Sequence, residues 1–66
     1  MFGTFQVTVR DEFGDAVLEF DNNSAALQIG VPDGRYVLTV ECAGKRRRFK
    51  VLVAGGSLAR ALPLPS

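Results

Sequence analysis

The sequence predicts a small all-β domain, specifically an antiparallel β-sandwich of six to seven short strands. Apolar and polar residues alternate over short stretches, turn-forming residues recur roughly every ten positions, and Gly30 and Pro32 interrupt the one stretch that would tolerate a helical turn. A chain of 66 residues has room for one domain, which we expect to span residues 1–66. Residues 61–66 are expected either to end the last strand or to form an extended tail.

The predicted strands follow one another with a turn after each. Residues 4–10 alternate most regularly, and the later strands are residues 16–20, 25–31, 36–42, 46–53 and 57–64. The turn before the fourth strand contains Pro32, Asp33 and Gly34. Proline presets the backbone angle of such a turn, and glycine adopts conformations that side chains resist. The prolines near the C-terminus keep the last strand at a sheet edge or in a tail, because proline cannot donate to a ladder.

Successive side chains of a strand point to opposite faces of the sheet, and this parity divides the apolar residues into an inward and an outward set. The inward set predicts one core: Phe5, Val7, Val9, Leu18, Phe20, Leu27, Ile29, Tyr36, Leu38, Val40, Phe49, Val51, Val53, Leu58 and Leu62. Val17, Val37 and Leu52 fall on outward positions, where an apolar cluster indicates a protein interface. So short a chain buries only roughly 60% of its unfolded surface, which favours oligomerisation.

The charges are unevenly distributed although the net charge is only +1. Residues 1–34 contain six acids and one base, whereas residues 35–66 contain seven bases and one acid. One interpretation is that the two halves lie side by side and their charges meet across the sheet. The other is a dipolar surface that steers a partner or stacks molecules head to tail.

The densest cluster of charge suggests an alternative function. Lys45, Arg46, Arg47, Arg48 and Lys50 form a basic hairpin that could lie along a nucleic-acid backbone. Strand parity separates these cations onto two faces, and no aromatic residue interleaves with them to stack on bases. Arg46, Arg48 and Lys50 are expected to share the face of Glu41 and Thr39, which predicts a solvated sheet surface with one cross-strand ion pair.

Few residues are suited to catalysis or metal binding. The chain has no histidine and one cysteine, Cys42, which we expect to be a buried structural thiol. Oxygen ligands for calcium could gather in two turns, although the same residue types are common in turns for local reasons: Asp11, Glu12, Asp15, Asp21, Asn22 and Asn23. We therefore expect no enzyme activity, no metal, no cofactor and no small-molecule substrate.

The sequence also bears on location. No apolar run approaches the length of a transmembrane helix, and residues 1–6 do not resemble a signal peptide. These observations, with an unpaired cysteine, predict a cytoplasmic protein without a membrane partner.

Several turns and strands resemble the small carboxypeptidase-regulatory or transthyretin-like β-sandwich modules and their PEGA-like relatives. The resemblance rests on Gly34 and Tyr36 after a turn, the Ala43-Gly44 turn, and the glycine-containing turn at residues 55–56. The first strand and its Asp-x-x-Gly turn are also similar, while basic residues replace the usual glycine-aromatic step after Ala43-Gly44. The resemblance implies a non-catalytic accessory module with no shared active site.

The sequence thus favours a structural or protein-binding module that self-assembles or docks on a partner protein. The alternatives are a nucleic-acid-binding protein that uses residues 45–50, and a small inhibitor or immunity-type protein. The tail at residues 61–66 is expected either to end in solvent or to serve as a proline-containing ligand for a partner.

Overall fold

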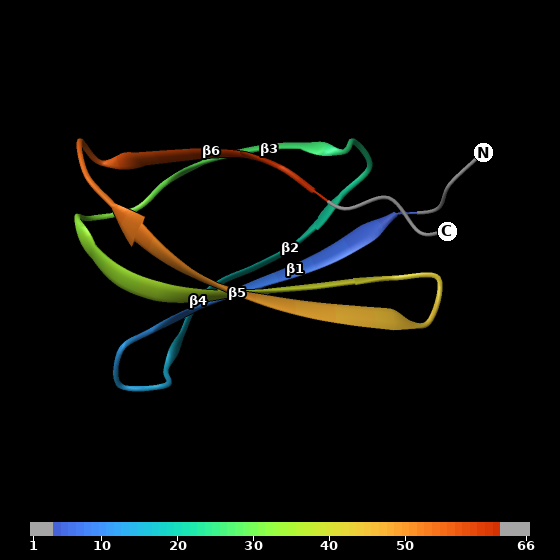
Figure 1. The fold of residues 1–66 in the computed structure, drawn as a ribbon, viewed down its shortest axis with the longest axis horizontal. Coiled ribbons are helices and arrows are strands. Elements are labelled where there is room, and N and C mark those ends of the chain that lie inside the picture. Colours follow the sequence, from blue (N-terminus) through green and yellow to red (C-terminus); the bar gives the residue numbers. More distant parts are fainter. Residues whose placement is uncertain (1–3, 63–66) are drawn as a thin grey trace.

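The computed structural model describes residues 4–62 and shows an all-β chain of six strands (Figure 1). The strands are β1 (Phe5–Asp11), β2 (Ala16–Asn22), β3 (Ala26–Gly30), β4 (Gly34–Cys42), β5 (Lys45–Val53) and β6 (Ser57–Ala61). No helix occurs between residues 4 and 62, so that stretch offers no helical span long and apolar enough to cross a membrane.

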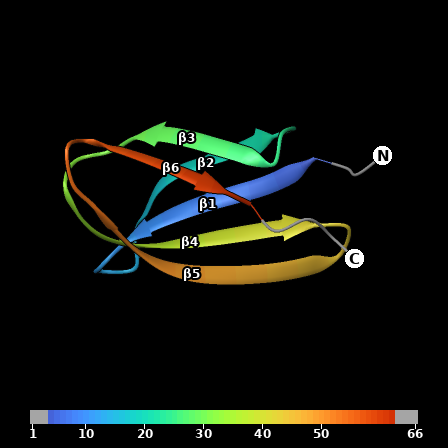
Figure 2. The same ribbon diagram turned by 45° about the horizontal axis from the view of Figure 1, so that its top comes forward.

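The strands form two antiparallel sheets. The larger sheet has the order β2-β1-β4-β5, and the smaller one consists of β3 and β6. Figures 1 and 2 show the smaller sheet lying along one side of the larger one. As a result β2 and β5 are the two edge strands of the larger sheet.

The predicted strand boundaries agree with the structure to within a few residues. β2 continues to Asn22, two residues beyond the predicted end at Phe20, and this shortens the polar turn that follows it. β4 begins at Gly34 rather than Tyr36. The last strand ends at Ala61, and the proline-containing tail predicted at 61–66 lies largely outside the described residues.

The two sheets contribute to one hydrophobic core. Phe5, Val7 and Val9 of β1 and Leu38 of β4 are almost completely buried, and Leu27 of β3 packs in the same cluster. Leu18, Phe20, Tyr36, Phe49 and Leu58 are partly buried against it. Every residue of the predicted core is therefore either buried or partly buried, because alternation correctly assigned the inner face of each strand.

Two turns at one end of the molecule are joined by hydrogen bonds. The backbone N–H of Gly56 donates to the carboxylate of Asp33 (2.7 Å), and the N–H of Val31 donates to the carbonyl of Gly56 (3.2 Å). The hydroxyl of Tyr36 donates to the carbonyl of Pro32 (2.6 Å). The two bonds to Gly56 connect the β3–β4 turn to the β5–β6 turn, where the chain passes between the two sheets, and the Tyr36 bond holds the β3–β4 turn itself.

The hairpin between β4 and β5 has a two-residue turn. Ala43 and Gly44 both have positive φ, 54° and 77°. Two successive positive φ values match the right-handed twist of the flanking strands, which is why such turns close tight hairpins. The turn fixes the register in which Glu41 lies opposite Arg46 and Thr39 opposite Arg48.

Candidate functional site

The two edge strands of the larger sheet carry opposite charges and form the candidate site. We call β5 with its neighbouring cations the basic edge, and β2 with its carboxylates the acidic edge. β1 and β4 lie between the two edges, so two strands separate the basic edge from the acidic edge. Each edge strand has a hydrogen-bonded neighbour on one side only within the described sheet.

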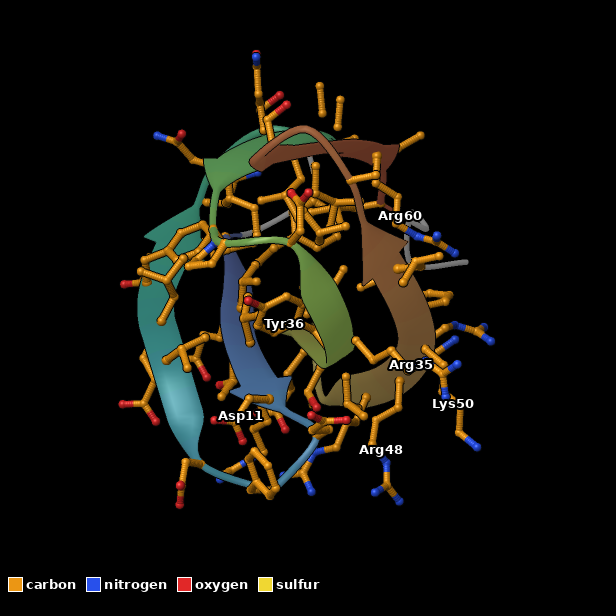
Figure 3. The ribbon with its side chains drawn as sticks, turned by 90° about the vertical axis from the view of Figure 1, so that its left-hand side faces the viewer. Asp11, Arg35, Tyr36, Arg48, Lys50 and Arg60 are labelled. Carbon is orange, nitrogen blue, oxygen red and sulfur yellow. The ribbon has the colours of Figure 1, made fainter. Side chains whose placement is uncertain are left out.

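The basic edge gathers cations from three strands. β5 contributes five of them, β4 adds Arg35 and β6 adds Arg60. Figure 3 shows Arg35, Arg48, Lys50 and Arg60 on the side of the molecule formed by β5, away from Asp11. The guanidinium carbon of Arg60 lies 4.4 Å from the centre of the Phe49 ring, a cation–π contact. Sequence reasoning missed Arg60 and Arg35, because only the pairing of strands brings them to β5.

The predicted parity of the basic hairpin is confirmed. Arg46, Arg48 and Lys50 lie opposite Glu41, Thr39 and Val37 on the outer face of the sheet. The guanidinium of Arg46 forms an ion pair with the carboxylate of Glu41 at 3.0 Å. The side chain of Arg46 is largely exposed and that of Glu41 is partly exposed, so water screens the pair and it contributes only about 0.2–1 kcal/mol.

The acidic edge has Glu19 and Asp21 on the same outer face. Glu19 lies opposite Thr8 of β1, and Asp21 lies opposite Gln6. Their neighbours across the sheet are therefore uncharged polar residues. The interpretation that the acidic and basic halves of the chain neutralise each other across the sheet is wrong for these strands, because the order β2-β1-β4-β5 places them at opposite edges. Their separation is what the dipolar interpretation requires.

The three residues predicted to form an apolar interface lie at one end of the outer face. Val17 on β2 is 44% exposed and Leu52 on β5 is 72% exposed, while Val37 on β4 is half-buried. Arg10 pairs with Val37 and separates it from β2. The three residues therefore do not form one continuous patch. Instead, each edge strand carries one exposed large apolar side chain.

An irregularity in β2 and an exposed aromatic residue were not predicted. The register between β1 and β2 shifts at Val9/Arg10, so that Arg10 lies opposite Ala16 and Val17 is the extra residue of a bulge. Phe13 in the β1–β2 turn is 82% exposed. Its position in a run of turn residues gave no indication of burial or exposure.

The acidic residues considered as calcium ligands do not assemble into a site. The carboxylate of Asp11 accepts hydrogen bonds from the backbone N–H groups of Phe13 and Asp15, at 2.9 and 3.0 Å. It therefore organises its own turn, as aspartate commonly does. Among residues 4–62, no group of three or more acidic or cysteine side chains is placed to hold a metal ion.

Two shallow depressions of the outer face are lined in part by residues of the basic edge. One, of about 380 Å³, lies over the centre of the sheet and is lined by Gln6, Thr8, Arg10, Thr39, Glu41, Arg46 and Arg48. The other, of about 400 Å³, lies beside Leu52 and includes Arg35, Lys50 and Glu12. Both are open and lie on a sheet surface, so their shape suits a flat partner better than an enclosed small molecule.

Cys42 lies at the end of β4 and is buried, as predicted. Its thiol belongs to the core cluster with Val40 and Leu62. This position gives Cys42 a packing role.

No family model matches the chain, and comparison with curated proteins and with solved structures also found no match. The resemblance to carboxypeptidase-regulatory and PEGA-like modules therefore stays a prediction.

Proposed function

We propose that this domain is a non-catalytic structural or protein-binding module that docks through the open edges of its larger sheet. The observation that supports the proposal most strongly is the opposite charge of the two edges. An edge strand offers unpaired backbone groups to an incoming strand, and the charges beside it select the partner. In this proposal the basic edge recognises an acidic strand and the acidic edge recognises a basic one.

The side chains at the edges suit this role. Leu18 and Phe20 on β2 and Phe49 on β5 are only partly buried against the core. A strand added at either edge would cover them and remove apolar surface from water. The absence of histidine from the chain and the burial of its one thiol are consistent with a binding role rather than a catalytic one. An unpaired cysteine also agrees with a reducing compartment, so the proposal places the module in the cytoplasm.

Short peptides can test the proposal directly. An isotope-labelled sample of the domain is titrated with a peptide that alternates glutamate with valine, and separately with one that alternates lysine with valine. We expect the acidic peptide to shift the amide resonances of β5 and the basic peptide to shift those of β2. Arg48→Glu should abolish the first response and leave the second intact. Equal responses of both edges to both peptides, or none, would contradict edge docking.

Nucleic acid is the second candidate partner, and the gathering of seven cations around β5 favours it: Arg35, Lys45, Arg46, Arg47, Arg48, Lys50 and Arg60. Phosphate binding to these cations must weaken steeply as salt rises. A single-stranded oligonucleotide that shifts the β5 resonances at low salt, when the acidic peptide shifts none, would favour this alternative over protein docking. The inhibitor or immunity-type function predicted from the sequence uses the same edges, and it remains one form of the protein-binding proposal.

A further inference from the structure

We infer that the partner of each edge is a second copy of this chain, and that copies pair head to tail, with β5 of one against β2 of the next. This inference rests on the proposed edge docking and names its partner. Three observations support it: the direction of the strands, their hydrogen-bond pattern, and the residues of β2 and β5 that lie at the two ends of each line of facing residues across the sheet.

Strand direction permits this pairing. Each neighbouring pair in the order β2-β1-β4-β5 is antiparallel, so β2 and β5 run in opposite directions. When a second copy is placed beside the first in the same orientation, its β2 runs antiparallel to the first copy's β5. The sheet then continues without a change in the alternation of strand direction.

The hydrogen-bond pattern also continues. A residue in an antiparallel strand points both its N–H and its C=O to the same side, so it makes a hydrogen-bonded pair with one neighbour and a non-hydrogen-bonded pair with the other. Along a line of residues that face one another across the sheet, which we call a row, the two kinds of pair therefore alternate from strand to strand. After an even number of strands, here four, the kind of pair that β5 still lacks is the kind that β2 still lacks. The two strands can then pair if the residues of β5 face those residues of the next β2 that continue the same rows.

In that register the two polar rows end in opposite charges. One row across the sheet runs Asp21, Gln6, Glu41 and Arg46, and another runs Glu19, Thr8, Thr39 and Arg48. Continuing the rows places Arg46 opposite Asp21 of the next copy and Arg48 opposite its Glu19. Opposite charges directly across an antiparallel pair stabilise it, whereas like charges destabilise it.

The rows on the inner face are complementary as well. One of them ends in Leu18 and Phe49, and the next ends in Phe20 and Arg47. The same register pairs Phe49 with Leu18 of the next copy, and Arg47 with its Phe20. The first is an apolar contact between two partly buried side chains, and the second brings a guanidinium to an aromatic ring.

Symmetric pairing of identical edges is disfavoured by the same charges. Two β5 strands paired about a two-fold axis would oppose the cationic stretch from Lys45 to Lys50 with itself. Two β2 strands would bring together the carboxylates of Glu19 and Asp21. A contact between unlike edges leaves one of each open at the ends, so we expect an open chain of copies rather than a closed dimer. The twist of the sheet makes that chain helical.

Charge exchange tests the inference with two variants. Glu19→Lys makes the acidic edge more basic, and Arg48→Glu makes the basic edge more acidic; neither residue takes part in the Glu41–Arg46 ion pair. Sedimentation velocity over a concentration series should show that wild type self-associates and that each variant alone associates about tenfold more weakly. An equimolar mixture of the two should recover association, because each altered edge then meets its complement.

The control is Asp15→Lys, which makes the same charge change as Glu19→Lys in the exposed β1–β2 turn, outside the paired rows. It should associate like wild type. Wild type that remains monomeric throughout, or a mixture that stays as weak as the separate variants, would overturn the inference. If the acidic and basic peptides still bind their edges in that case, edge docking stands and only the identity of the partner is wrong. If the peptides also fail to bind, both proposals fall.

Discussion

Leu38 and Thr39 are neighbours on β4, yet they belong to two regions with different physical roles. Leu38 is fully buried on the inner face of the larger sheet, whereas Thr39 is half-exposed on the outer face, between the two charged edges. The inner face holds the two sheets together by removing apolar surface from water. The outer face contributes less to stability, because its charged side chains stay largely in contact with water. Substitutions on the two faces should therefore have different consequences.

The largest effect is expected for Leu38→Ala. Truncating a buried leucine removes its transfer free energy and leaves a cavity, which costs about 2–5 kcal/mol. In so small a domain that is a large part of the total stability. Urea unfolding followed by circular dichroism would measure the loss. Thr39→Ala, one residue away, should lower the free energy of unfolding by less than about 1 kcal/mol, and an equal loss in both variants would contradict the contrast between faces.

A smaller effect is expected for Tyr36→Phe, which keeps the ring at the inner face and removes the hydroxyl that donates to the carbonyl of Pro32. Losing one hydrogen bond of this kind should lower the free energy of unfolding by about 0.5–1.5 kcal/mol. Thermal unfolding would show a lower midpoint with an unchanged folded spectrum. A stability equal to wild type would mean that the hydroxyl is satisfied equally well by water.

On the outer face, Glu41→Gln should have a still smaller effect. It removes the charge that pairs with Arg46, so the expected loss is about 0.2–1 kcal/mol at low salt. Screening weakens an exposed ion pair, so the difference from wild type should shrink as salt is added. A loss that does not depend on salt would show that Glu41 acts through something other than this pair.

The smallest effect on stability is expected for Leu52→Thr. Leu52 is 72% exposed, and replacing it with threonine, a β-branched residue that suits a strand, should change the free energy of unfolding by less than about 0.5 kcal/mol. Its effect on association should be larger than its effect on folding, because Leu52 is an exposed apolar side chain on β5, the strand that meets the next copy in the head-to-tail arrangement. A fall in stability without any change in sedimentation would assign Leu52 to the fold rather than to an interface.

The sequence by itself determined the fold class, the number of strands and the face on which each side chain lies. Alternation with a period of two is a local property, so it could be read from each stretch separately, as in Val7 against Thr8 or Leu38 against Thr39. The turn at Ala43-Gly44 is also local, and it brought Glu41 opposite Arg46 as expected. The predicted burial of Cys42 is also confirmed, although it rested on the usual burial of an unpaired thiol and not on alternation.

Only the tertiary structure decided where the charges lie relative to one another. The acids of β2 and the bases of β5 could have met across the sheet, and local patterns contain no information about which strands become neighbours. Strand order results from the packing of both sheets around a shared core, to which residues distant in sequence, such as Phe5, Leu27 and Leu38, contribute together. That packing places β1 and β4 at the centre of the larger sheet. It therefore leaves one acidic and one basic edge, and it adds Arg35 and Arg60 to the latter.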